Sequence, residues 1–163
     1  GTRPLLVEVQ ALVAPTDVVP PRRVANGIDR NRLAMILAVL SRHGGVGVGN
    51  ADVFVNVAGG VRVDEPGADL AIALAIASAH RGEPLSDAEG RPLACFGEVG
   101  LTGELRYVAH AERRVAEALK FGLSPILGPA IMDAPRGLDP AATLRAALGA
   151  ARKRSAAPLR EAA

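Results

Sequence analysis

Residues 52–78 read DVFVNVAGGVRVDEPGADLAIALAIAS, and this stretch decides the fold. Its first part is rich in Val and predicts a strand over 52–63 that two glycines interrupt. Pro66 stands where a first helical residue would be, with Asp64 expected as the cap. The helix expected from there to Arg81 is apolar on almost every side, so it should be buried at the centre of the domain. The stretch therefore predicts a strand followed by a core helix.

Segments on either side of this stretch also show strand and helix patterns. Upstream, Leu5–Val13 reads as a strand, 16–28 as a loop, and Asp29 can cap a helix that runs to about His43. That helix has one apolar face, because its Leu and Ile residues recur at three- and four-residue spacing. Downstream, the sequence predicts a strand over 93–99, a hairpin over 100–108, a helix over 111–121, a short strand over 125–127, and a last helix that begins at Asp139-Pro140 and ends in Arg152-Lys153-Arg154. Strands interleaved with helices predict an α/β domain with mixed strand order.

Length and composition indicate one domain with an aliphatic core. The chain has 163 residues, of which 49% are hydrophobic and only 2% aromatic, so Val, Leu, Ile and Ala must fill the interior. We expect residues 1–150 to form the domain and residues 151–163 to be a basic, disordered tail. Because Gly1 leads almost at once into a strand pattern, we expect the chain to be a fragment of a longer protein.

Charge, cysteine content and hydropathy indicate the cellular compartment and the partners to expect. The formal net charge of +2 is too small to argue for nucleic acid by itself. Cys95 is the one cysteine, so no disulfide can form within the chain, which fits a reducing cytoplasm. The sequence does not open with a signal peptide, and its longest apolar run, Leu70–Ala79, is far shorter than the roughly 18 residues needed to cross a bilayer. We therefore expect a cytoplasmic protein without a membrane partner.

The short motifs in the sequence do not point to catalysis or metal binding. His43, His80 and His110 are widely separated and have no Cys or carboxylate at ligand spacing, so we expect no metal. The glycine-rich segment 44–49 follows a helix rather than a strand and lacks the Gly-Lys-Ser/Thr ending of a P-loop. It therefore predicts no ATP site. The serines inside the expected helices have no partner base nearby in sequence and do not read as nucleophiles.

Arginines supply the candidate contacts to DNA. Arg30 and Arg32 stand at a helix start, where the helix dipole disfavours cations, so an outside anion is one explanation for them. The alternative is that they are solvated charges, or that one of them pairs with a carboxylate inside the domain. With so few aromatic residues, a contact to DNA should be made to phosphates rather than by base stacking. The DNA-binding candidates are Arg22, Arg23, Arg30, Arg32, Arg113 and Arg114.

Four segments resemble a known family. Asp52–Ser78 and Phe96–Arg106 are similar to the C-terminal Lon protease-like domain of bacterial RadA/Sms DNA repair proteins, and so are Arg3–Val13 and Gly27–Leu33. The resemblance covers roughly residues 2–148, with the segments in the same order and spacing. It implies the ribosomal protein S5 domain 2-like α/β fold, which is that of the Lon proteolytic domain.

The resemblance also implies that the domain is not an enzyme. In Lon proteases a serine opens the buried helix, and a lysine from a later helix acts as its base. Those two positions fall on Gly67 and Glu112. Glycine has no side chain that could attack a peptide, and glutamate carries the wrong charge to lower the pKa of a hydroxyl group. The resemblance therefore implies an inactive peptidase domain with no cofactor or metal of its own.

A role inside a larger protein follows from the same resemblance. RadA/Sms proteins combine a zinc motif and a RecA-like ATPase with this domain, and they act as ring-shaped, DNA-dependent motors that drive branch migration in homologous recombination. ATP, magnesium and zinc would then belong to upstream domains outside this chain. The implied partners are the phosphate backbone of duplex DNA, further copies of the chain in a ring that we expect to be hexameric, and the RecA-type recombinase pathway.

Three other interpretations stay open. The first is an active Lon-type Ser/Lys peptidase, which would require the two site positions to be misassigned. The second is the Lon-like domain of a ComM or magnesium-chelatase-like ATPase, which has a pattern similar to Leu-Thr-Gly-Glu-Leu at residues 101–105. The third is an α/β binding module with no DNA role.

Overall fold

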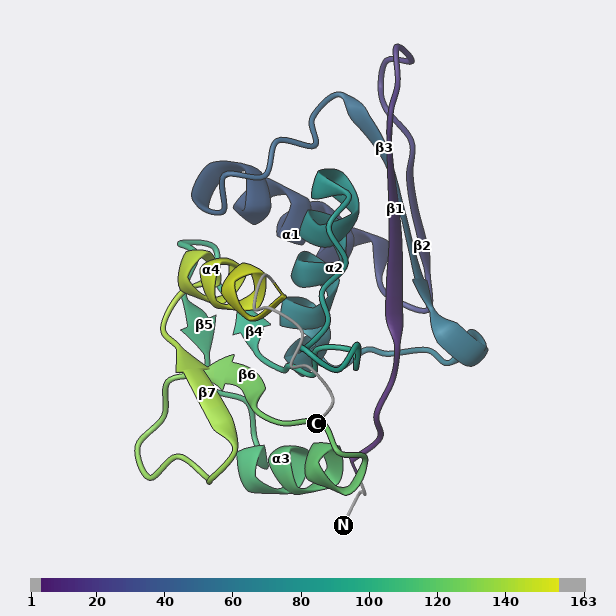
Figure 1. The fold of residues 1–163 in the computed structure, drawn as a ribbon. Helices are drawn as coiled ribbons and strands as arrows, with labels where there is room; N and C mark the ends of the chain where they lie inside the picture. Colours follow the sequence, from purple (N-terminus) through teal and green to yellow (C-terminus); the bar gives the residue numbers. More distant parts are fainter. Residues whose placement is uncertain (1–3, 156–163) are drawn as a thin grey trace.

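A three-stranded sheet forms one side of the molecule (Figure 1). The computed structural model describes residues 4–155. The central strand β3 (Ala51–Val57) pairs antiparallel with β1 (Val9–Pro15) and parallel with β2 (Arg23–Asn26). The parallel pair is joined by a helical crossover, as parallel strands require. The fold is therefore a mixed α/β fold, as the alternation of patterns predicted.

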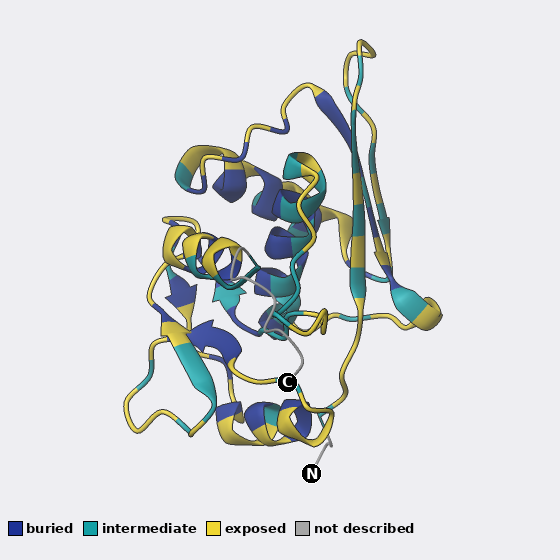
Figure 2. Ribbon diagram, viewed as in Figure 1, coloured by how far each residue is buried: buried dark blue, intermediate teal, exposed yellow. Residues whose placement is uncertain are grey.

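Two helices cover one face of this sheet. Helix α1 (Arg30–His43) begins at Asp29, whose carboxylate accepts a hydrogen bond from the Arg32 amide at 3.1 Å, and ends at Gly44. Helix α2 (Asp69–Arg81) is buried along most of its length, and it ends at Gly82 in the left-handed conformation. Figure 2 shows the buried residues concentrated between these helices and the sheet. The core is aliphatic, with Val53, Val55 and Val57 of β3 almost fully buried.

A second, smaller group of elements lies below the helices in Figure 1. Strands β4 (Glu98–Val99) and β5 (Leu105–Arg106) form a hairpin, and β6 (Ile126–Pro129) pairs parallel with β7 (Leu138–Ala141). Helix α3 (Ala111–Lys120) packs its apolar side here, and α4 (Leu144–Ser155) returns the chain to α1 and α2. This arrangement places the C-terminal end of α1 next to the N-terminal end of α4.

The β4–β5 hairpin depends on a carboxylate that caps its turn. Glu104 accepts hydrogen bonds from the Thr102 amide at 3.2 Å, from the Thr102 hydroxyl group, and from Nε of Arg106 at 3.0 Å. The hydrogen bond from the Thr102 hydroxyl group, followed by those from the backbone amide of Glu104 itself and from Arg106, lowers the pKa of Glu104 to about 2. A Cβ atom at Gly100 would lie 1.8 Å from Oε1 of Glu104, so only glycine leaves room for this cap.

Several expected boundaries were wrong. The first strand begins at Val9 rather than Leu5, and the expected loop over 16–28 contains strand β2. Asp139-Pro140 lies in strand β7 instead of opening the last helix, which begins at Leu144. Of the strand expected over 93–99, only Glu98–Val99 is a named strand. The first helical turn of the central segment, η2 (Pro66–Ala68), is capped by Glu65 rather than Asp64.

Other expectations were confirmed. The helices expected after Asp29 and over 111–121, the central buried helix, and the hairpin over 100–108 are all present. The expected start of a disordered tail at residue 151, by contrast, was wrong, because helix α4 continues through Ser155 with Ala151 buried. Residues 156–163 of the expected tail lie outside the described residues. Between residues 4 and 155, the helices are all too short or too polar to cross a membrane.

Candidate functional site

Gly67 lies in a tight, buried turn between β3 and α2. Its amide donates a hydrogen bond to Oε1 of Glu65 at 3.2 Å, and its carbonyl oxygen accepts one from the Gly97 amide at 2.8 Å. A Cβ atom at this position would lie 3.0 Å from Nη1 of Arg114 and 3.1 Å from Cγ1 of Val108. The space that a nucleophilic side chain would need is therefore already closely surrounded.

Arg114 of α3 fills the region in front of Gly67. Its Nη2 lies 3.2 Å from Oε1 of Glu65, and its Nε donates to the carbonyl oxygen of Ala109 at 3.0 Å. The guanidinium carbon lies 5.9 Å from the centre of the Phe96 ring. An arginine held by a carboxylate, a carbonyl oxygen and an aromatic ring is fixed in place, and it can neither attack a peptide nor accept a proton.

Glu112, the residue at the expected base position, faces solvent on another side of α3. It lines an open hollow of about 630 Å³ together with Tyr107, His110 and Met132. Gly67 is not among the residues that line this hollow. The structure therefore does not join Gly67 and Glu112 in one cleft. Arg114, two residues further along α3, is the side chain that reaches Gly67.

Arg22 is bound to a buried carboxylate at the edge of the sheet. Its Nε and Nη2 donate to Oδ2 of Asp52 at 3.1 and 2.8 Å, and its backbone amide donates to Oδ1 at 2.7 Å. These bonds from Arg22 hold the pKa of Asp52 below its ordinary value. The Arg22 guanidinium carbon also lies 5.6 Å from the centre of the Phe54 ring. Because the Arg22 side chain is 66% exposed, one face of it stays open to solvent.

Arg23 and Arg32 have partners inside the domain. Arg23 donates to the carbonyl oxygens of Ala51 and Val48. Arg32 makes two side-chain hydrogen bonds to the fully buried Asp69 of α2. The interpretation that Arg30 or Arg32 pairs with an internal carboxylate is thus correct for Arg32.

The Arg32–Asp69 pair joins three elements. Oδ2 of Asp69 also accepts a hydrogen bond from the Val99 amide of β4 at 3.0 Å. Burial raises the pKa of Asp69, against the opposing effect of the hydrogen bonds from Arg32 and Val99, while the bond to Asp69 raises the pKa of Arg32. The pair therefore ties the starts of α1 and α2 to β4.

The remaining candidates, Arg30 and Arg113, are exposed. Neither side chain makes a hydrogen bond or ion pair with any residue between 4 and 155. Sequence reasoning missed further cations of this kind, among them Arg42 and Arg145, which are exposed near the junction of α1 and α4. A signal was present in the sequence, because the segments that form α1 and α4 contain Arg and Lys but no Asp or Glu.

We next consider the side chains of the described region that could hold a metal ion or react as a nucleophile. There, His, Cys, Asp and Glu side chains do not gather in groups of three or more that could hold a metal ion. Cys95 is partly buried beside β6, where it forms a parallel bridge with Leu127, and burial raises the pKa of its thiol to about 12. The thiol is therefore protonated at neutral pH.

Comparison with known proteins gives a consistent set of relatives, although no family model matches the chain. It is 53% identical over 129 residues to the DNA repair protein RadA of Haemophilus influenzae, and 51% identical over 142 residues to that of Escherichia coli. It is 48% identical over 144 residues to RadA of Bacillus subtilis. These matches cover 79%, 85% and 85% of this chain but only 27%, 30% and 30% of the relatives. The chain thus spans less than a third of the length of the proteins it matches.

Proposed function

The chain matches a C-terminal region of the DNA repair protein RadA, and from this premise we propose that it is a catalytically inactive Lon-like domain that serves as an assembly and duplex-DNA-binding platform in DNA repair. The relatives' names support the repair role. The observation that carries the proposal is the environment of Gly67, where a residue without a side chain stands at the expected nucleophile position and Arg114 and Glu65 occupy the space around it.

The fold is consistent with this role. A three-stranded sheet with β3 between β1 and β2, covered on one face by α1 and α2, supports assignment to the S5 domain 2-like fold of the Lon proteolytic domain. In that fold the turn before the buried helix carries the nucleophile of the active enzymes. Here the turn is η2, and Gly67 is buried within it.

The whole protein would supply the motor. Because the chain covers about 30% of RadA proteins, we propose that a zinc motif and an ATPase domain that binds ATP and magnesium lie outside it. In this proposal the full-length protein drives branch migration of recombination intermediates alongside a RecA-type recombinase. The present domain would contribute subunit contacts of a hexameric ring and hold the duplex by its phosphates.

The inactive-peptidase part of the proposal is tested by restoring the missing residues. We expect no turnover of casein or a fluorogenic peptide by the unmodified chain or by Gly67→Ser, because a hydroxyl group without a base is a poor nucleophile. The double variant Gly67→Ser/Glu112→Lys should also be inactive, because Glu112 faces the hollow rather than Gly67. Circular dichroism would show that each variant is folded.

Two outcomes would contradict this part of the proposal. Turnover by the unmodified chain would mean that a nucleophile other than the expected one operates. Turnover by the double variant alone would mean that positions 67 and 112 do come together in solution. A pair with Lys at position 114, Gly67→Ser/Arg114→Lys, provides a sharper comparison because Arg114 is the residue that contacts Gly67.

A further inference from the structure

Helices α1 and α4 carry an unusual concentration of positive charge. Neither contains Asp or Glu, although together they contain seven Arg or Lys residues. Two of the seven have carboxylate partners: Arg32 is bound by Asp69, and Arg152 makes an exposed ion pair with Glu83 at 3.2 Å. The others, Arg30, Arg42, Arg145, Lys153 and Arg154, have no ion-pair partner among residues 4–155.

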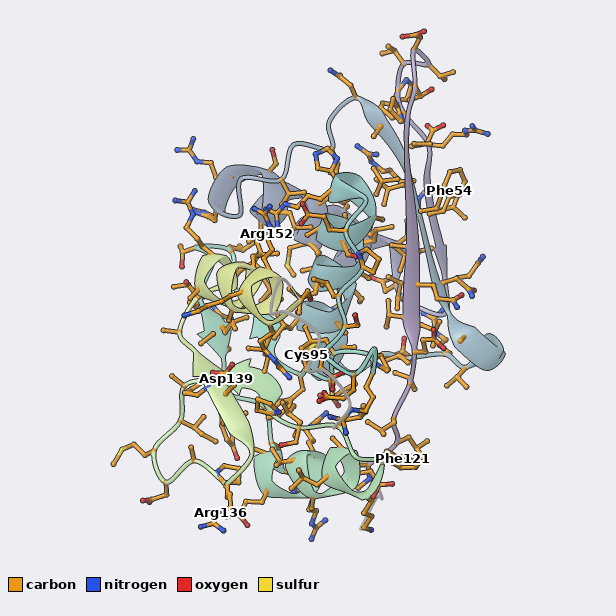
Figure 3. The ribbon with its side chains drawn as sticks, viewed as in Figure 1. Phe54, Cys95, Phe121, Arg136, Asp139 and Arg152 are labelled. Atoms are coloured by element: carbon orange, nitrogen blue, oxygen red, sulfur yellow. The ribbon has the colours of Figure 1, made fainter. Side chains whose placement is uncertain are left out.

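Four of the seven cations, one of them the paired Arg152, lie on the side of the molecule where α1 meets α4. On α4, the exposed residues Arg145, Arg152 and Lys153 are seven and eight positions apart, which places them on the same side of the helix. The end of α1 adjoins the start of α4, since a Cβ atom at Gly45 would lie 3.8 Å from Nη2 of Arg145. We call Arg42, Arg145, Arg152 and Lys153 the basic stripe. In Figure 3, nitrogen-tipped side chains extend outward from α1 and α4 on this side of the molecule.

The position of Arg145 is not explained by the stability of its own helix. It lies in the first turn of α4, where the positive end of the helix dipole repels a cation. The only cap seen there is the Thr143 hydroxyl group, which accepts a hydrogen bond from the Ala146 amide at 3.1 Å. Arg42, by contrast, lies in the last turn of α1, where the dipole favours it. An external anion would balance Arg145 as well as Arg42.

The surface around the basic stripe carries several glycines and few large apolar side chains, and the hollow that Arg152 lines is small. Gly47, Gly49 and Gly149 have no neighbouring atom within 4 Å of where a Cβ atom would be. The large exposed apolar side chains of the described region all lie outside α1 and α4. Such a surface lacks the apolar and aromatic anchors of a protein–protein interface and the stacking platform of a single-strand binder. It allows the close approach of a rigid, charged backbone.

We propose that the basic stripe binds the phosphate backbone of duplex DNA. This inference rests on the proposed function and specifies the surface through which the domain would meet DNA. Arg145 and Lys153 lie about 12 Å apart along α4, so they would contact separate phosphates of the duplex. Arg152 is more than half exposed in its pair with Glu83, so phosphate can compete for it. Arg23, Arg32 and Arg114, in contrast, are partly buried against their partners within the domain and are not free to bind phosphate.

The test compares two double variants that remove the same charge. Arg145→Gln/Lys153→Gln alters the stripe, whereas Arg62→Gln/Arg136→Gln alters two exposed arginines elsewhere, neither of them a DNA-binding candidate. Arg62 makes only an exposed ion pair with Asp64, and Figure 3 labels Arg136 on the β6–β7 loop, far from α4. Binding of the 163-residue chain to a fluorescent duplex would be followed by anisotropy between about 50 and about 200 mM salt. Because the altered side chains are exposed, both variants should fold, which circular dichroism would check.

We expect the stripe variant to lose two phosphate contacts. The slope of log affinity against log salt should then fall in magnitude by about 1.8, and the affinity at about 0.1 M salt should fall about 60-fold. The control variant should keep the slope of the unmodified chain. Equal losses in both variants would mean that only total charge matters, and an unchanged slope in the stripe variant would mean that the DNA surface lies elsewhere. Either result overturns the proposal.

Other readouts separate this proposal from the proposed function. If the unmodified chain binds DNA and the stripe variant binds equally well, only the assignment of the surface is wrong. If the unmodified chain does not bind duplex at the lowest salt, the DNA-binding part of the proposed function is wrong as well. Light scattering would show whether the stripe variant instead changes the oligomeric state, in which case the stripe contacts a second copy of the chain.

Discussion

Arg32 and Arg145 occupy similar places in two helices but have different surroundings. Each lies in the first turn of a helix that contains no acidic residue. Arg32 meets the fully buried Asp69 of α2, whereas the side chain of Arg145 makes no ion pair or hydrogen bond with any residue in the range 4–155. The carboxylate that makes the difference comes from a neighbouring element. Whether an arginine at a helix start is paired inside the domain or open to an external anion therefore depends on the element that packs against that helix.

The largest expected effect in this comparison comes from Asp69→Ala. Removing the carboxylate leaves the partly buried Arg32 guanidinium with only Glu98, at 4.0 Å, and the Val99 amide without its acceptor, so the free energy of unfolding should fall by about 3–5 kcal/mol. Urea denaturation followed by circular dichroism would measure it. The double variant Asp69→Ala/Arg32→Met should be less destabilised than Asp69→Ala alone, because no unpaired charge remains. A loss below about 1 kcal/mol in the single variant would show that the pair is hydrated.

A smaller effect is expected from Arg22→Ala, which removes a largely exposed arginine from Asp52. The pKa of Asp52 should rise toward its ordinary value, since the side-chain hydrogen bonds from Arg22 are the main cause of its lowering. A lowered carboxyl pKa stabilises the fold above the unfolded-state pKa of about 3.9, and this contribution disappears as the pH falls through the folded-state value. The stability curves of the two proteins should therefore converge in acid. Carbon-detected NMR titration of Asp52 would measure the shift, and an unchanged pKa would contradict the assignment.

The smallest effect on stability is expected at the basic stripe. Arg145→Ala should change the free energy of unfolding by no more than about 0.5 kcal/mol, because the side chain has no partner to lose within the described structure. The sign should favour the variant slightly, since a cation is removed from the positive end of α4. Thermal unfolding of Arg145→Ala and of Arg32→Ala, each measured against the unmodified chain, would compare the two losses of stability. A loss comparable to that of Arg32→Ala would show that Arg145 has a structural partner in solution.

The sequence predicted the elements whose patterns are local. Helix α1 has its cap at Asp29 and its apolar spacing within fourteen residues, and the β4–β5 hairpin has Gly100 and Gly103 close together in the chain. Strand β2 was missed because it has only four residues and is held by parallel pairing to β3, which α1 brings into place. Asp139-Pro140 resembles a helix start, yet the segment pairs with β6, where Pro140 needs no amide hydrogen.

The candidate site was predicted only in part for a similar reason. The expected positions of Gly67 and Glu112 followed from resemblance, but which side chain of α3 faces Gly67 depends on how that helix is rotated against η2. Arg114 was expected to contact DNA, and its contacts to Glu65 and Ala109 could not be read from sequence. Likewise, Arg32 and Asp69 are 37 residues apart, so their pairing depends on the packing of α1 against α2.

Strand β3 lies between β1 and β2 in the sheet, although it is the last of the three in the chain. On the ribosome, Val9 has no partner until Val57 has been synthesised. At about 5–20 residues per second, the residues between 15 and 57 take about 2–8 s to appear. During that interval β1 and β2 are unpaired strands with open backbone groups, the species most prone to aggregate. Synthesis of β3 therefore closes two open strands at once, and the risk of aggregation is concentrated in the seconds before it is made.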